Sequence, residues 1–154
     1  MSAGRRPAAK AALAGAIATD TLGHVLVGAA LDEARKRSVR IAVAVVDAGG
    51  HVLACARMDG LPWQLGEIAL DKAATAAGFG VATAALAFDL ARHSKNATDF
   101  FRGRAGIVLL GGGVPLRIDG RLVGGIGISG GSEAEDEACA RAAIAACPGV
   151  TDER

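Results

Sequence analysis

Residues 40–58 read RIAVAVVDAGGHVLACARM, and this stretch decides the fold. Two apolar runs, 40–47 and 51–58, are separated by a turn with the sequence Asp47-Ala48-Gly49-Gly50. A short β-branched run, a glycine turn and a second apolar run together predict a β-hairpin, whose two strands are antiparallel. The sequence Asp59-Gly60-Leu61-Pro62 breaks the chain directly after it.

Helices and further strands are predicted outward from this hairpin. Four helices are predicted, at 19–37, 65–77, 83–92 and 132–146. Thr19 or Thr21 is expected to cap the first and Thr83 the third. Ser132 and Glu135 form a capping box at the start of the last. Three further strands are predicted at 106–110, 114–118 and 121–128. The dipeptide Asp119-Gly120 between two of them is a strong hairpin signal, and the polar stretch 93–104 is expected to be a loop. Because the tight turns make neighbouring strands antiparallel, the sequence predicts an α+β fold with helices covering one sheet.

Length and composition limit the function. The 154 residues form one domain, predicted at 19–148 between a flexible tail at 1–18 and a short tail at 149–154. The chain is 51% hydrophobic with a formal net charge of +1, which excludes a disordered protein and argues against nucleic-acid binding. No uncharged apolar run is long enough to span a membrane. Arg5, Arg6 and Lys10 before an alanine-rich run only weakly resemble an export signal.

The three cysteines, Cys55, Cys139 and Cys147, show neither a disulfide framework nor a zinc pattern. We therefore expect reduced thiols in small core positions and a cytoplasmic location. The histidines His24, His51 and His93 have no metal-ligand spacing, so no metal site is predicted. Each of them, or Met58, is a possible axial ligand of haem.

A group of polar residues within 47–72 is the best candidate site. Its members are Asp47, His51, Arg57, Asp59, Trp63, Glu67, Asp71 and Lys72. In a catalytic interpretation Arg57 holds a carboxylate, Glu67 or Asp47 moves a proton, and His51 or Lys72 stabilises charge. In a structural interpretation Asp47 caps its own turn, Arg57 pairs with Glu67 or Asp71, and Lys72 reaches solvent. We expect the hairpin and the helix behind it to bring the group around one cavity.

The glycine-rich run 124–131 leads into the last helix and superficially resembles a phosphate-binding loop. Most of these glycines fall inside a predicted strand, where glycine usually marks a close backbone approach. Backbone N–H groups at 129–132 are a weaker candidate for binding a carboxylate. The alternative is that Ser132 and Glu135 satisfy these donors themselves, and we favour it.

Several blocks in order resemble the GlcG/HbpS family over residues 20–147. The blocks are 41–53, Arg57-Met58-Asp59-Gly60, 69–76, 111–116 with 124–131, and Asp136-Glu137. The resemblance implies a profilin-like fold with a five-stranded antiparallel sheet, and assembly into dimers or larger oligomers. It implies varied roles: haem binding and degradation, a domain attached to corrinoid adenosyltransferases, and companions of small-acid catabolic operons. No transferase region is present in this sequence, so the stand-alone form is expected.

Two positions depart from the secreted haem-binding members of that family. These members carry two glutamates three residues apart on the central helix, used for iron. Glu67 matches the first, but Leu70 stands at the second. The haem-contacting threonine of those members falls at Ile107. Both departures argue against sensing of haem or iron.

Three functions remain open from the sequence. The first is an oligomeric protein that binds a small ligand, with haem or a corrinoid as the best-known type. The second is a cofactor-independent lyase or isomerase acting on a small carboxylate. The third is a structural partner whose small-residue surfaces serve assembly alone. No nucleic acid or membrane partner is expected.

Overall fold

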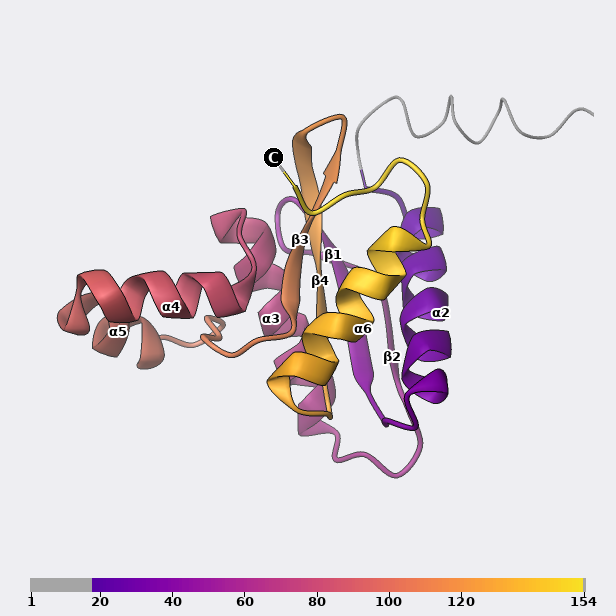
Figure 1. Ribbon diagram of the computed structural model, residues 1–154, viewed down its shortest axis with the longest axis horizontal. Coiled ribbons are helices and arrows are strands. Elements are labelled where there is room, and N and C mark those ends of the chain that lie inside the picture. Colours follow the sequence, from indigo (N-terminus) through magenta and orange to yellow (C-terminus); the bar gives the residue numbers. More distant parts are fainter. Residues whose placement is uncertain (1–17, 154) are drawn as a thin grey trace, which may run out of the picture.

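A computed structural model describes residues 18–153 as an antiparallel sheet with helices on both faces (Figure 1). The strands are β1 (Ala42–Asp47), β2 (Val52–Arg57), β3 (Gly113–Ile118) and β4 (Arg121–Ser129), in the sheet order β2-β1-β4-β3. The helices are α2 (Asp20–Lys36), α3 (Gln64–Phe79), α4 (Thr83–His93), α5 (Lys95–Arg102) and α6 (Glu133–Ala145). The predicted α+β class is confirmed, but the prediction of five strands is wrong, because the described residues contain four.

Both predicted hairpins are confirmed. β1 pairs with β2 from Ala42 opposite Arg57 onward, and a β-bulge interrupts the register between Val45 and Val46. β3 and β4 are joined by Asp119 and Gly120, which both have positive φ, at 51° and 75°. Positive φ at both central residues is what a two-residue turn needs to match the twist of its strands.

The two faces of the sheet are covered differently (Figure 1). Helices α2 and α6 lie on one face, where they bury the larger apolar side chains of β1 and β4, including Val43, Val45, Ile126 and Ile128. Helix α3 covers the other face and meets Ala44 and Val46 of β1. Helices α4 and α5 project sideways from this body (Figure 1).

The strand glycines predicted to mark a close backbone approach do so. A Cβ atom added to Gly127 would overlap the carbonyl oxygen of Ala69 in α3, and one added to Gly125 would overlap that of Ala73. Glycine on β4 therefore lets the backbone of α3 lie directly on the sheet.

The predicted strand 106–110 is a loop in the structure. The N–H of Val108 donates to the hydroxyl of Thr75 in α3 (3.0 Å), and the hydroxyl of Thr83 in α4 donates to the carbonyl of Leu110 (2.6 Å). Threonine side chains thus satisfy backbone groups that a neighbouring strand would otherwise bind. An apolar run by itself does not distinguish these two outcomes.

Two predictions at the projecting helices are also wrong. The stretch 93–104 was expected to be a loop, but Ser94 caps α5 by accepting a hydrogen bond from Ala97 N at 3.1 Å. An ion pair between Lys95 and Asp99 (2.7 Å) supports this short helix. Thr83 is not the cap of α4, since Ala82 precedes the helix and the Thr83 hydroxyl binds Leu110 and Gly113.

The remaining sequence expectations have mixed outcomes. Cys139 and Cys147 are buried, and burial raises the pKa of both thiols, but Cys55 is exposed and is not a core residue. Of the tail expected at 1–18, only Ala18 lies within the described residues, and it is buried. In the tail expected at 149–154, Val150 is buried and Thr151 exchanges two backbone hydrogen bonds with Arg117.

Within residues 18–153 no single helix is long and apolar enough to cross a membrane, although α3 and α4 together, bent by 66°, reach that length and composition.

Candidate functional site

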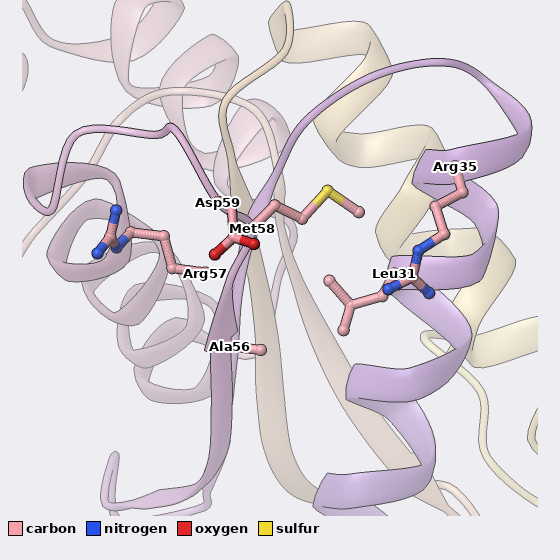
Figure 2. A pocket seen from close by; sticks show the side chains of 6 residues that line it. All are labelled: Leu31, Arg35, Ala56, Arg57, Met58 and Asp59. Atoms are coloured by element: carbon pink, nitrogen blue, oxygen red, sulfur yellow. The ribbon is translucent and has the colours of Figure 1, made fainter.

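A pocket lies between α2 and the end of β2 (Figure 2). Its volume is about 310 Å³, and its lining residues are Leu31, Arg35, Ala56, Arg57, Met58 and Asp59. Leu31 and Met58 point toward one another across it (Figure 2). The lining therefore combines apolar side chains with charged residues, the two kinds of group that small-molecule sites use.

The pocket forms where α2 and β2 separate. Near the start of α2 they are in close contact, because a Cβ added to Gly23 would lie 3.0 Å from the Cβ of Leu53. Leu31 follows eight residues later, about 12 Å further along the helix axis. There the side chains of Leu31 and Met58 line a hollow between the helix and the end of the strand.

The predicted site residues do not gather around one cavity. Asp47 and His51 lie at the closed end of the hairpin, and Arg57 and Asp59 lie at its open end. Six residues of extended chain from His51 to Arg57 span about 20 Å. The expectation that one cavity unites the group is therefore wrong, because the extended strands keep the two ends of the hairpin apart.

Asp47 is engaged in its own turn, as the structural interpretation predicted. One of its carboxylate oxygens accepts hydrogen bonds from Gly49 N at 2.8 Å and His51 N at 3.0 Å. The His51 ring nitrogen lies 3.4 Å from the same oxygen. The backbone N–H of His51 is the main cause that lowers the pKa of Asp47.

Arg57 lines the pocket but directs its guanidinium group away from it, toward the α3 side (Figure 2). That group donates to the carbonyl oxygen of Leu61. It makes no ion pair with Glu67 or Asp71 within 4.0 Å, so the predicted pairing is wrong. Glu67 and Asp59 are exposed, and Trp63 is 61% exposed just before α3.

Lys72 neither reaches solvent, as the structural interpretation predicted, nor faces a shared site, as the catalytic interpretation required. It is buried, and its ammonium group donates to the Ile128 carbonyl at 2.9 Å and to Asp136 at 3.0 Å. Asp71, its neighbour on α3, is half-buried at the helix edge. Lys72 therefore belongs to the packing between α3, β4 and α6, and it does not face the pocket.

The backbone donors before α6 are satisfied by the chain itself. Ser132 N donates to Glu135 at 2.8 Å, and Glu135 N donates to the Ser132 hydroxyl, which completes the predicted capping box. Gly131 N donates to Asp136 at 2.9 Å. These bonds take up donors that a bound carboxylate would use, as the alternative interpretation expected.

Sequence reasoning missed one flank of α2. Leu31 and Arg35 line the pocket, and His24 and Gly28 precede them at helical spacing, so all four share one side of the helix. Nδ1 of His24 lies 2.8 Å from the carbonyl oxygen of Asp20, which leaves Nε2 free. A Cβ added to Gly28 would meet open space. The sequence carries this signal as helical spacing of residues 24, 28, 31 and 35.

The sulfur of Met58 is already engaged, because Ile41 N donates to it at 3.4 Å. Across residues 18–153, no group of three or more His, Cys, Asp or Glu side chains is arranged to hold a metal ion.

Comparisons with known proteins agree on one family. Residues 19–145 match the family described as haem degrading protein HbpS-like. Protein GlcG of Escherichia coli K12 is 33% identical over 113 residues, which cover 73% of this chain and 81% of GlcG. The corrinoid adenosyltransferase PduO of Salmonella typhimurium LT2 is 36% identical over 126 residues. The match covers 80% of this chain but only 37% of the length of PduO.

A solved structure described as a complex of PduOC with haem has the same fold. It superimposes with a TM-score of 0.77 at 34% sequence identity, over 85% of this chain and 94% of the other.

Proposed function

The chain belongs to the HbpS-like family, and we propose that it is a homo-oligomeric protein that binds a tetrapyrrole, haem or a corrinoid, along the flank of α2. One observation carries this proposal: His24, Gly28, Leu31 and Arg35 follow one another on one side of the helix and lead into the pocket. The related PduOC structure is a complex with haem, which supports the ligand class.

The residues of this flank suit the parts of such a ligand. Haem iron is commonly held by a histidine ring nitrogen, and His24 keeps Nε2 free while Nδ1 contacts a backbone carbonyl. Gly28 presents no side chain, so a flat ring can lie against the helix there. Arg35 stands about 16 Å from His24 along the axis, by a rise of 1.5 Å per residue, and guanidinium groups bind carboxylates such as propionates.

The pocket volume supports binding that extends beyond the pocket. Its volume of about 310 Å³ is at the lower end of small-molecule sites, which run from about 300 to 1,000 Å³. A tetrapyrrole would place one edge between Leu31 and Met58 and leave its remainder over Gly28. A second protein surface is then needed to cover the exposed face, in keeping with a homo-oligomer.

The catalytic alternative gains no support from the geometry. Glu67 is exposed on α3, Asp47 caps a turn, and Lys72 is buried in an ion pair, so the three groups do not meet at one substrate. The cytoplasmic location stays a prediction.

Haem titration followed by the Soret band tests the proposal, with two histidine variants as a matched pair. His24 and His93 are both exposed, and Nδ1 of each lies 2.8 Å from the carbonyl oxygen four residues earlier. We expect His24→Ala to weaken haem binding at least tenfold and to change the Soret maximum, and His93→Ala to do neither. Equal effects of the two variants, or an unchanged His24→Ala, would refute the proposed site. A cobalamin titration in parallel distinguishes the two tetrapyrroles.

A further inference from the structure

Two opposite charges line the pocket without neutralising each other. Arg35 of α2 and Asp59, which lies just beyond the end of β2, are both lining residues. Among residues 18–153 they form no ion pair with each other within 4.0 Å. In Figure 2 the two charged groups lie on opposite sides of Leu31 and Met58. A ligand group that enters the pocket between them can therefore contact both.

The carboxylate of Asp59 is not used by the fold. Aspartate in a turn usually accepts hydrogen bonds from the backbone that follows it, as Asp47 does from Gly49 N and His51 N. In the part of the chain that the structure describes, no hydrogen bond or ion pair engages the Asp59 side chain. Its acceptor oxygens are consequently available to a ligand.

The backbone around Asp59 is held on both sides. Met58 N donates to the Ile41 carbonyl at 3.0 Å, and Ile41 N donates to the sulfur of Met58 at 3.4 Å. On the other side of the turn, the guanidinium group of Arg57 donates to the carbonyl oxygen of Leu61. Asp59 therefore stands at the pocket on a segment whose two ends are both anchored.

Arg35 keeps hydrogen-bond donors for a ligand. One of its nitrogens donates to Asp32 on the same helix at 2.9 Å, in an exposed pair. A guanidinium group carries five N–H donors, so this bond leaves the others available. The pocket thus offers a donor on its helix side and an acceptor on its strand side.

We propose that Asp59 sets the ligand preference of the site by accepting a hydrogen bond from a primary carboxamide, whose oxygen accepts one from Arg35. This inference rests on the proposed function and names which tetrapyrrole the site prefers. A carboxamide has N–H donors and a carbonyl acceptor on one group, so it satisfies both side chains. A corrinoid carries primary carboxamides around its ring, whereas haem carries propionates, which only accept. The pocket therefore prefers a corrinoid.

Haem meets one favourable and one unfavourable charge in the same pocket. Arg35 attracts a propionate, but Asp59 repels it, because both are carboxylates. A preference between two ligands is a difference of affinities, and a repulsive contact contributes to that difference as much as an attractive one. Haem binding is thus weakened by Asp59 and does not depend on it.

Equilibrium dialysis of the full chain against cobinamide, and separately against haem, tests the proposal. Asp59→Ala removes the acceptor, so cobinamide affinity should fall about tenfold, as for a lost hydrogen bond to a charged group. Asp59→Asn keeps an acceptor oxygen without the charge, so most of the cobinamide affinity should remain. Haem affinity should rise about threefold in both variants, the size of a contact between exposed charges.

Asp89→Asn is the matched control for net charge. Asp89 is an exposed carboxylate on α4 that forms no ion pair within the described residues, and it does not line the pocket. This variant loses one negative charge, as the Asp59 variants do, and should leave both affinities unchanged. Circular dichroism checks that all three variants are folded, which we expect because both positions are exposed.

A second comparison changes the ligand and keeps its ring and metal. Cobyrinic acid carries carboxylates where cobinamide carries amides, so the native chain should bind cobinamide more tightly. Asp59→Asn removes the repulsion of those carboxylates, so the preference for cobinamide should narrow. A native chain that does not distinguish the two corrinoids would overturn the proposal.

The outcomes separate this inference from the proposed function. An unchanged ratio of cobinamide to haem affinity in both Asp59 variants overturns the role of Asp59 alone, and so does a native chain that binds haem but no cobinamide. Equal losses of cobinamide affinity in Asp59→Ala and Asp59→Asn would indicate a charge effect and also overturn it. A native chain that binds neither ligand overturns the tetrapyrrole site and this inference together.

Discussion

The ammonium nitrogen of Lys72 lies 3.0 Å from a carboxylate oxygen of Asp136, and both side chains are 3% exposed. The pair joins α3 to the first turn of α6 past the end of β4, whose Ile128 carbonyl also accepts from Lys72. Burial raises the pKa of Asp136, while the hydrogen bond and charge of Lys72 act in the opposite direction. One buried ion pair thus connects α3 and α6, which lie on opposite faces of the sheet.

Removing one partner of this pair should destabilise the protein strongly. Asp136→Leu leaves a buried ammonium group without its counter-charge, at a cost of about 3–5 kcal/mol in the free energy of unfolding. The double variant Lys72→Met with Asp136→Leu removes both charges and should recover most of that loss. Urea denaturation of the single and double variants measures this coupling. Additive losses would show that the two charges do not depend on each other.

Gly127→Ala should separate α3 from the sheet. The new Cβ would overlap the carbonyl oxygen of Ala69 and lie 2.5 Å from Ala73 N, both backbone atoms that cannot rotate away. Overpacking of this kind costs roughly 1–3 kcal/mol or more. Gly78→Ala is the control, because a Cβ there meets nothing within 4 Å and should add about 0.5–1 kcal/mol. Thermal unfolding of both variants gives the comparison, and similar melting temperatures would contradict it.

The turn at Asp47 should make stability depend on pH in the acid range. Hydrogen bonds from His51 N and Gly49 N favour the carboxylate, so the pKa of Asp47 in the folded state lies below its ordinary value of 3.8. Its contribution to stability is complete above pH 3.8 and is lost as the pH falls through the folded pKa. Asp47→Asn keeps an acceptor oxygen without a titrating proton. The difference between the two unfolding curves should therefore shrink below pH 3.8, and a difference that is constant with pH would count against this account.

Gly28→Leu should raise the stability of the protein and weaken its binding of haem. Glycine within a helix is about 0.8–1.0 kcal/mol less favourable than alanine, and leucine is nearly as good as alanine. The side chain meets open space, so the variant should unfold at a higher temperature than the native chain. The same side chain stands where the proposed tetrapyrrole lies, so haem binding should weaken at least tenfold. A variant that is stabilised and binds haem normally would remove Gly28 from the site.

The sequence predicted the local elements well where short-range chemistry decides them. The turns at Asp47–Gly50 and at Asp119-Gly120 and the capping box at Ser132 are confirmed, because each depends on residues within four positions of one another. The stretch 106–110 was read wrongly because its backbone is bound by Thr75 and Thr83, about 30 positions away in the chain. The short helix α5 was missed because its cap and its ion pair lie in a polar segment with few apolar residues.

At the candidate site, too, neighbouring residues in the sequence do not predict which side chains come together in the fold. Sequence proximity grouped Asp47, Arg57 and Lys72, but an extended strand separates the first two, and the third points into the protein interior. The residues that do line the pocket come from α2 and β2, whose contact the sequence does not specify.

The sequence alone determined the hairpins, most helices, the capping box at Ser132, the antiparallel class and the family resemblance, because these follow from patterns of neighbouring residues. Only the tertiary structure decided that Lys72 meets Asp136 across 64 positions, and that His24, Gly28 and Arg35 lead into a pocket with Met58. The physical reason is that packing brings together groups distant along the chain, and their burial and contacts depend on the whole arrangement of helices and sheet.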